Sequence, residues 1–206
     1  MLLDENHIQD RYKSISAPAT GLFKDKGSRF IAHSFPVENE TEIKEIIESL
    51  KKEYHDARHH CYAYRLGRLG DKFRANDDGE PSSSAGRPIL GQIVSNELSD
   101  ILIVVVRYFG GIKLGVPGLI RAYKTASADA ISNSEIIVKT ECRDFRLLFE
   151  YMNTEPVMRL IKDLRIAILS QAITESCILD VRVKLSQELL FLEKISNING
   201  CRYERL

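Results

Sequence analysis

The sequence predicts an α+β protein of two domains, residues 1–138 and residues 139–206. The chain has 206 residues, which is enough for one large or two small domains with cores of their own. Ile101–Val106 is an unbroken run of β-branched residues and leucine, the composition of a strand buried on both faces. After residue 136 a new succession of strand and helix patterns begins. This restart places the domain boundary near residues 136–142.

In the first domain, helices are indicated by apolar spacing and by capping residues. Between Asn39 and Tyr54, isoleucine and leucine recur at the spacing of one helix face, and Asn39 with Glu42 forms a capping box. Further helices are expected at residues 81–98 and 117–131, the second with small residues along its apolar stripe. Strands are expected at residues 12–16, 21–23, 28–37, 61–66 and 101–106.

The second domain has the predicted order β-α-β-β-α-β, which is the order of the ferredoxin-like fold. Its strands are expected at residues 142–149, 165–174, 176–185 and 201–206, and its helices at residues 154–164 and 187–198. In the last helix, Leu189, Leu190 and Leu192 are expected to face the core.

The composition is that of a globular protein whose charges balance. The chain carries 29 basic and 29 acidic side chains, and 44% of its residues are apolar. Neither residues 1–139 nor residues 140–206 has the basic excess of a non-specific nucleic-acid binder, so contact with nucleic acid requires a local patch. No signal-peptide pattern, membrane-length apolar run or CxxC pair is visible. We therefore expect a cytoplasmic protein with free thiols, no zinc ribbon and no membrane partner.

The segment from Gly110 to Gly115 follows the buried strand, precedes a predicted helix and carries the clearest binding signal in the chain. Gly110, Gly111 and Gly115 allow close approach of the backbone, and Arg107 and Lys113 accompany them. Because free N–H groups at a helix N-terminus favour an anion, a pocket for a phosphate or a carboxylate is predicted here. The segment is neither a P-loop nor a dinucleotide fingerprint, and the alternative is a tight turn with a structural role.

The segment Gly86–Gly115 resembles the signature of the Impact family, called the YigZ group in bacteria. The resemblance extends to residues 59–61 (HHC), 77–81 (DDGEP) and 118–123 (GLIRAY), and covers residues 20 to 130. It implies that the first domain has the fold shared by a ribosomal-protein domain and domain IV of elongation factor G. It also implies a ferredoxin-like second domain. Both folds recur in the translation machinery, so the resemblance implies contact with RNA, the ribosome or a translation-associated protein, without DNA specificity, and a link to regulation of translation.

Histidines and a cysteine lead into one predicted strand. Alternation along a strand puts His59 and Cys61 on one face and His60 on the other. Same-face Cα atoms are about 7 Å apart, which is poor for a Cys–His nucleophile pair, so Cys61 is expected in the core. His55 and His59, with Asp56 beside the first, resemble the zincin motif HExxH. Because this segment falls where a helix should end, a polar helix end is expected there rather than zinc.

Three carboxylates, those of Asp77, Asp78 and Glu80, lie in one glycine-containing loop. They can pair with Arg107 or Arg121 and so fix the loop onto the segment Gly110–Gly115, called the glycine turn below. They can also recognise a partner, or ligate Mg²⁺ or Ca²⁺, although their spacing is not that of an EF-hand. Structural pairing is the favoured interpretation, and no metal or cofactor is assigned.

The predicted binding surface gathers these motifs at one edge of the sheet. Its residues are His59, His60, Asp77, Asp78, Glu80, Arg107, Gly110, Gly111, Lys113, Gly115 and Arg121. A basic patch is predicted from Lys24, Lys26 and Arg29. Because no complete nucleophile–base–orienter set can be named, the sequence favours a binding protein without turnover and without catalytic residues. The alternative is a hydrolase of a small substrate that uses His59 or His60 with the acidic loop.

Overall fold

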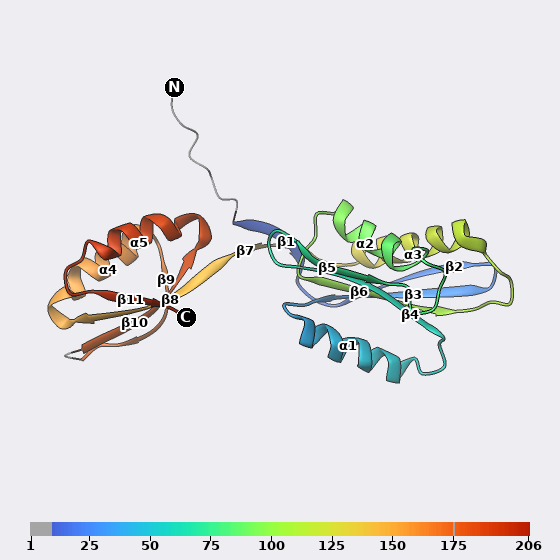
Figure 1. Ribbon diagram of the computed structural model, residues 1–206, viewed down its shortest axis with the longest axis horizontal. Helices are drawn as coiled ribbons and strands as arrows, with labels where there is room; N and C mark the ends of the chain where they lie inside the picture. The colour runs from blue at the N-terminus through green and yellow to red at the C-terminus, as the bar shows by residue number, and fades with distance from the viewer. Residues whose placement is uncertain (1–9, 175) are drawn as a thin grey trace, which may run out of the picture. The chain divides into compact units, whose positions relative to one another are not determined.

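A computed structural model describes residues 10–174 and 176–206 (Figure 1). The protein has the predicted α+β class. Residues 12–139 form one compact unit, and residues 140–206 form a second unit together with Asp10 and Arg11. No described helix is both long and apolar enough to cross a bilayer. All four cysteines are free thiols.

A five-stranded antiparallel sheet is the central layer of the unit formed by residues 12–139. Its strand order is β2-β3-β6-β4-β5. The strands are β2 (Ala19–Asp25), β3 (Ser28–Pro36), β4 (His59–Leu66), β5 (Lys72–Asn76) and β6 (Ile101–Tyr108). A separate two-stranded sheet contains β1 (Arg11–Ile15) and β7 (Ile136–Thr140).

Helices cover both faces of this sheet (Figure 1). α1 (Glu40–Glu53) lies on one face, and α2 (Gly86–Ser95) and α3 (Gly115–Ser132) lie on the other. The central strand β6 contributes alternate residues to the two resulting cores, Ile103 on the side of α2 and α3, and Val104 on the side of α1. The prediction that the apolar run is buried on both faces is therefore confirmed.

Local sequence explains how these helices begin and pack. The Asn39 side chain caps α1 by accepting the Glu42 N–H at 2.9 Å, as predicted. The small residues of α3 form the predicted buried stripe. They let β2 approach so closely that a Cβ on Gly21 would lie 2.2 Å from the backbone nitrogen of Ala130.

The helix expected at residues 81–98 is shorter, and its predicted N-terminus is wrong. α2 begins at Gly86, because Ser83 adopts the left-handed conformation with φ 63° and interrupts a continuous helix. The N–H groups of Ser83, Ala85 and Gly86 instead donate to the Asp77 carboxylate at 2.8–3.0 Å. Asp77 therefore holds the turn that precedes the helix.

The unit formed by residues 140–206 has a four-stranded antiparallel sheet of order β11-β8-β10-β9. The strands are β8 (Cys142–Glu150), β9 (Ala167–Ala172), β10 (Ser176–Lys184) and β11 (Arg202–Arg205), and the helices are α4 (Thr154–Asp163) and α5 (Glu188–Ser196). The expectation that Leu189 and Leu190 face the core is wrong, since they are 73% and 43% exposed. Phe191 and Ile195, four residues apart on α5, fill the core instead.

Two histidines are buried on the α1 side of the larger sheet. The Nε2 atoms of His33 and His60 have no hydrogen-bond partner among the described residues. Burial lowers the pKa of both rings, against the opposing charges of Glu53 near His33 and of Asp78 near His60. Below about pH 6.5, where a free histidine binds a proton, the folded protein therefore binds fewer protons than the unfolded chain.

The free energy of unfolding should consequently decrease as the pH falls from about 7 to about 5.5, by at most about 1.4 kcal/mol per pH unit for each histidine. Urea denaturation at several pH values measures this dependence. Replacing His33 with Gln should make the dependence shallower, because it removes one of the two histidines with a lowered pKa. Parallel curves for the His33 variant and the wild type would contradict this explanation.

Candidate functional site

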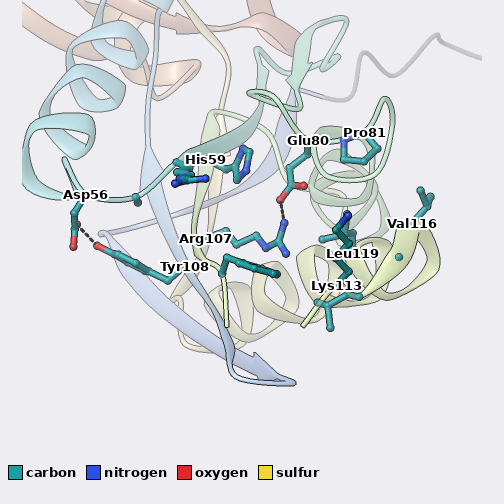
Figure 2. Close-up of a pocket in the computed structure, with 14 residues that line it drawn as sticks. Asp56, His59, Glu80, Pro81, Arg107, Tyr108, Lys113, Val116 and Leu119 are labelled. Atoms are coloured by element: carbon teal, nitrogen blue, oxygen red, sulfur yellow. Dashed lines mark hydrogen bonds and ion pairs between the residues drawn. The ribbon is translucent and has the colours of Figure 1, made fainter. Parts of the chain in front are cut away.

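A pocket of about 700 Å³ opens at the edge of the sheet where β4 begins, β6 ends and α3 begins (Figure 2). Its acidic, basic and histidine residues are Asp56, Arg58, His59, Glu80, Arg107 and Lys113. Its apolar walls include Pro81, Leu114, Val116 and Leu119. Strand ends and a helix N-terminus thus bring together five of the residues predicted from the sequence, namely His59, Glu80, Arg107, Lys113 and Gly115.

A buried ion pair anchors the acidic loop at this pocket. Arg107 Nη1 donates to Glu80 Oε1 at 2.5 Å, and the two side chains are only 8% and 3% exposed. The Tyr123 hydroxyl donates to the same oxygen at 2.7 Å, and the Cys61 thiol donates to that hydroxyl at 3.3 Å. Burial raises the pKa of Tyr123, and burial raises the pKa of Cys61 to about 12. Cys61 is therefore a neutral core residue, as expected, and Glu80 is the carboxylate that pairs with Arg107.

The Arg107 guanidinium is held between two aromatic rings. Its Cζ atom lies 5.5 Å from the centre of the Phe30 ring and 5.6 Å from that of Phe109. Its Nε is buried and has no hydrogen-bond partner among the described residues. Packing and one acceptor, Glu80, fix the group in place, and the described residues leave most of its N–H donors unused.

His59 is oriented by a backbone carbonyl. Its Nδ1 lies 2.9 Å from the oxygen of Asp78, and a carbonyl can only accept, so Nδ1 carries the hydrogen. In the neutral tautomer with hydrogen on Nδ1, Nε2 is the acceptor. Figure 2 shows His59 beside Arg107 on the wall of the pocket.

The other predicted residues of the histidine and acidic motifs lie outside this pocket. Asp77 caps the turn before α2, and although burial opposes the effect, its three backbone hydrogen bonds lower the pKa of this carboxyl. Asp78 accepts the His60 N–H at 2.7 Å and lies 3.6 Å from Lys51. It lines a second pocket of about 480 Å³ along α1. His60 is buried on that side of the sheet. Asp78 therefore touches His59 through its backbone carbonyl, but neither the Asp78 carboxylate nor His60 lines the pocket that His59 lines.

The glycine turn is in contact with the hairpin between β2 and β3. The Gly110 N–H donates to Ser28 Oγ at 3.0 Å, and a Cβ on Gly110 would lie 1.9 Å from the carbonyl carbon of Gly27. Gly111 and Gly115 have φ values of 88° and 69°, which glycine adopts readily. Gly111 and Gly115 therefore allow the backbone conformation of the turn, and Gly110 allows the turn to approach the β2–β3 hairpin closely.

The basic residues predicted as a patch lie on the hairpin whose turn makes this contact. Lys24, Lys26 and Arg29 are exposed on the hairpin. Arg121, on α3, pairs with Asp25 of the same hairpin at 2.7 Å rather than with the acidic loop. Arg29 lies over the Tyr108 ring, with Cζ 5.0 Å from its centre.

The zincin-like spacing of His55 and His59 does not place the two rings on one helix. α1 ends at Glu53, His55 lies in the following turn, and His59 is the first residue of β4. The part of the chain that is described contains no cluster of three or more histidine, cysteine or acidic side chains suited to a metal ion.

Several lining residues are absent from the binding surface predicted from the sequence, among them Phe109 and Arg58. Phe109 is 56% exposed and lines the pocket. Arg58 also lines it. The signal for both is their position at the ends of strands, next to the glycine turn or the histidines.

The whole pocket lies within a segment that matches one protein-family model. Residues 26–131 match the Impact N-terminal domain. The chain belongs to the Impact family. The match also includes Lys26, Arg29 and Arg121, whereas Lys24 lies just before it. The family predicted from the sequence motifs is thus confirmed.

Relatives support this membership, and a solved structure has a similar fold. The chain is 41% identical over 124 residues to the IMPACT family member YvyE of Bacillus subtilis, covering 60% of this chain and 57% of that relative, less than two thirds of its length. It is 38% identical over 138 residues to the IMPACT family member YigZ of Escherichia coli, covering 66% of this chain and 68% of that one. A crystal structure of a hypothetical protein is similar with a TM-score of 0.71 at 28% identity, covering 97% of this chain and 98% of that chain.

Proposed function

We propose that this Impact family member is a non-enzymatic binding protein that contacts RNA, in free form or on the ribosome, and is linked to regulation of translation. The observation that carries the proposal is the contact between Gly27 and Gly110. It joins the basic hairpin to the turn that bears Lys113, although the two are far apart in sequence. The chain as a whole has no net charge, so RNA binding requires a local basic surface, and the hairpin together with Lys113 would provide it.

Aromatic side chains lie within the same surface. Phe109 is 56% exposed between the pocket and the glycine turn, and Tyr108 is half-buried beneath Arg29. Proteins that bind single strands combine cations along the backbone with aromatic faces on which bases stack. The combination favours a single-stranded segment over a duplex, whose bases are already stacked.

A fold is proposed for each of the two units, from strand connectivity for residues 140–206 and from the family resemblance for residues 12–139. The order β8-α4-β9-β10-α5-β11 with sheet order β11-β8-β10-β9 fits a ferredoxin-like domain. For residues 12–139 we propose the fold shared by a ribosomal-protein domain and domain IV of elongation factor G, on the family resemblance. Both assignments argue for the translation machinery by analogy. A cytoplasmic location is proposed with them, in keeping with four free thiols.

Binding to a short single-stranded RNA should weaken as salt is added, with a log–log slope near −2 to −4, because about three to five phosphates are neutralised at about 0.7 per contact. Fluorescence anisotropy across a salt series measures the slope. Replacing Lys26 with Asn should reduce its magnitude by somewhat under one unit and weaken all sequences alike. Asn suits this position, because Lys26 has a φ of 46°, in the left-handed region.

Lys52 provides the matched control for this experiment. It is an exposed lysine in the last turn of α1, outside both the hairpin and the pocket. Replacing Lys52 with Ala should leave the slope unchanged. Absence of binding at low salt, or equal effects of the two substitutions, would refute the proposed surface.

The alternative, a hydrolase acting on a small substrate, is favoured by one observation, the orientation of His59. With Nδ1 held by the Asp78 carbonyl, Nε2 is available as a general base at the pocket. Among the described residues, no serine, threonine or cysteine lines this pocket, so the nucleophile would be water. Turnover in a panel of ester and phosphoester substrates that is lost in a His59→Gln variant would establish the hydrolase.

A further inference from the structure

The pocket is suited to a more specific ligand than the surface around it. We infer that it holds the terminal phosphomonoester of an RNA strand, so that the protein prefers RNA ends that carry a phosphate. This inference rests on the proposed RNA binding and names the part of the RNA that enters the pocket.

Arg107 is the first group that points to this ligand. Its side chain is 8% exposed, yet it lines the pocket. Among the described residues its guanidinium has one acceptor, Glu80, and its Nε is buried without a partner. The rings of Phe30 and Phe109 hold it in position. Because Nε is inaccessible, the donors that can match the oxygens of a phosphate are the Nη groups left over from the pair with Glu80.

The N-terminus of α3 is the second group. α3 has 18 residues, and its first residues, Gly115 and Val116, line the same pocket. Leu114 at the N-cap makes no side-chain hydrogen bond to the helix, and no side chain of the described residues satisfies the N–H groups of the first turn, to which Pro117 contributes none. The exposed amine of Lys113, which also lines the pocket, has no ion-pair partner among the described residues. The helix end and the lysine both favour an anion.

The two carboxylates of the pocket do not oppose this ligand strongly. Asp56 accepts a hydrogen bond at 2.7 Å from the hydroxyl of the neighbouring tyrosine. Glu80 is 3% exposed and is paired with Arg107. Arg58 and Lys113 remain as exposed cations of the lining. The pocket therefore has an excess of positive charge once the internal pair is counted.

Depth distinguishes a terminal phosphate from an internal one. An internal phosphodiester carries chain on both sides, so it stays at the rim of a recess, whereas a phosphomonoester carries chain on one side and can enter. It also presents three acceptor oxygens and a charge of about −1.5 to −2 at neutral pH. Only such a group can approach a guanidinium that is 92% buried by the walls and by Phe109. A volume of about 700 Å³ is sufficient for one nucleotide.

The inference is tested with one short RNA sequence bearing either a 5′-phosphate, a 3′-phosphate or hydroxyls at both ends. A fourth RNA, one nucleotide longer with two hydroxyl ends, adds an internal phosphate and controls for charge. We expect one of the phosphorylated forms to bind about tenfold more tightly than both hydroxyl forms, as for a gained charge-assisted hydrogen bond. The two phosphorylated forms identify which end enters the pocket. A Lys113→Ala variant should lose most of this ratio, and Lys52→Ala should keep it.

The outcomes separate this inference from the proposed function. Equal binding of all four RNAs, with the salt dependence retained, would refute the terminal site and leave RNA binding intact. No binding of any form would refute both. A ratio that survives in the Lys113→Ala variant would place the phosphate elsewhere and overturn the assignment. Competition by adenosine monophosphate against the phosphorylated RNA alone would support the pocket directly.

Discussion

Replacing Glu80 with Ala should destabilise the protein by about 3–5 kcal/mol, because it leaves the Arg107 charge buried without a partner. The Glu80 side chain is 3% exposed, and the same oxygen accepts from Arg107 and from Tyr123, so water cannot replace it readily. Glu80→Gln should cost less than Glu80→Ala, since the amide oxygen can still accept a hydrogen bond. Chemical denaturation monitored by circular dichroism gives the free energies.

The exposed pair of Asp25 and Arg121 is the natural comparison. The Arg121 side chain is 67% exposed, so Asp25→Ala should cost no more than about 1 kcal/mol. Replacing both Glu80 and Arg107 with apolar residues should be less harmful than Glu80→Ala alone, because no isolated charge remains. If the double replacement destabilised the protein by as much as the sum of the two single replacements, the unpaired buried charge would not be the cause of the loss in Glu80→Ala.

Much of the fold can be predicted because the relevant signals are local. The apolar run of β6, the small-residue stripe of α3 and the capping of α1 by Asn39 each depend on neighbours a few residues away. Local signals predict the wrong start for α2. Residues 82–84 are serines, which resemble helix caps, but the Asp77 carboxylate in the preceding loop accepts the backbone N–H groups of Ser83 and Ala85. Whether Asp77 reaches these N–H groups depends on how its loop folds back, and the spacing of apolar residues does not predict that.

The site could be predicted only in part, for the same reason. The glycine turn, Arg107 and Lys113 are recognisable because a strand, glycines and a helix start occur in order. The sequence offers three carboxylates for Arg107, and only the folded loop selects Glu80. Strand alternation correctly puts His59 and His60 on opposite faces of the sheet. It does not show which face lies against α1, or that the Asp78 carbonyl orients the His59 ring.

Gly110→Ala should destabilise the protein by about 1–3 kcal/mol and weaken RNA binding at the same time. Its Cβ would lie 1.9 Å from the carbonyl carbon of Gly27 and 2.2 Å from the backbone nitrogen of Ser28. Both are backbone atoms, so the hairpin or the glycine turn must move, and the basic surface that they form together is disrupted.

Gly91 is the control for Gly110, because a Cβ there would meet nothing within 4 Å and the residue lies within α2. Gly91→Ala should stabilise the protein by up to about 1 kcal/mol through helix propensity and leave RNA binding unchanged. Denaturation and anisotropy of the same samples compare both variants. Binding that persists at full strength in a correctly folded Gly110→Ala variant would show that the hairpin and the glycine turn need not be joined for RNA to bind.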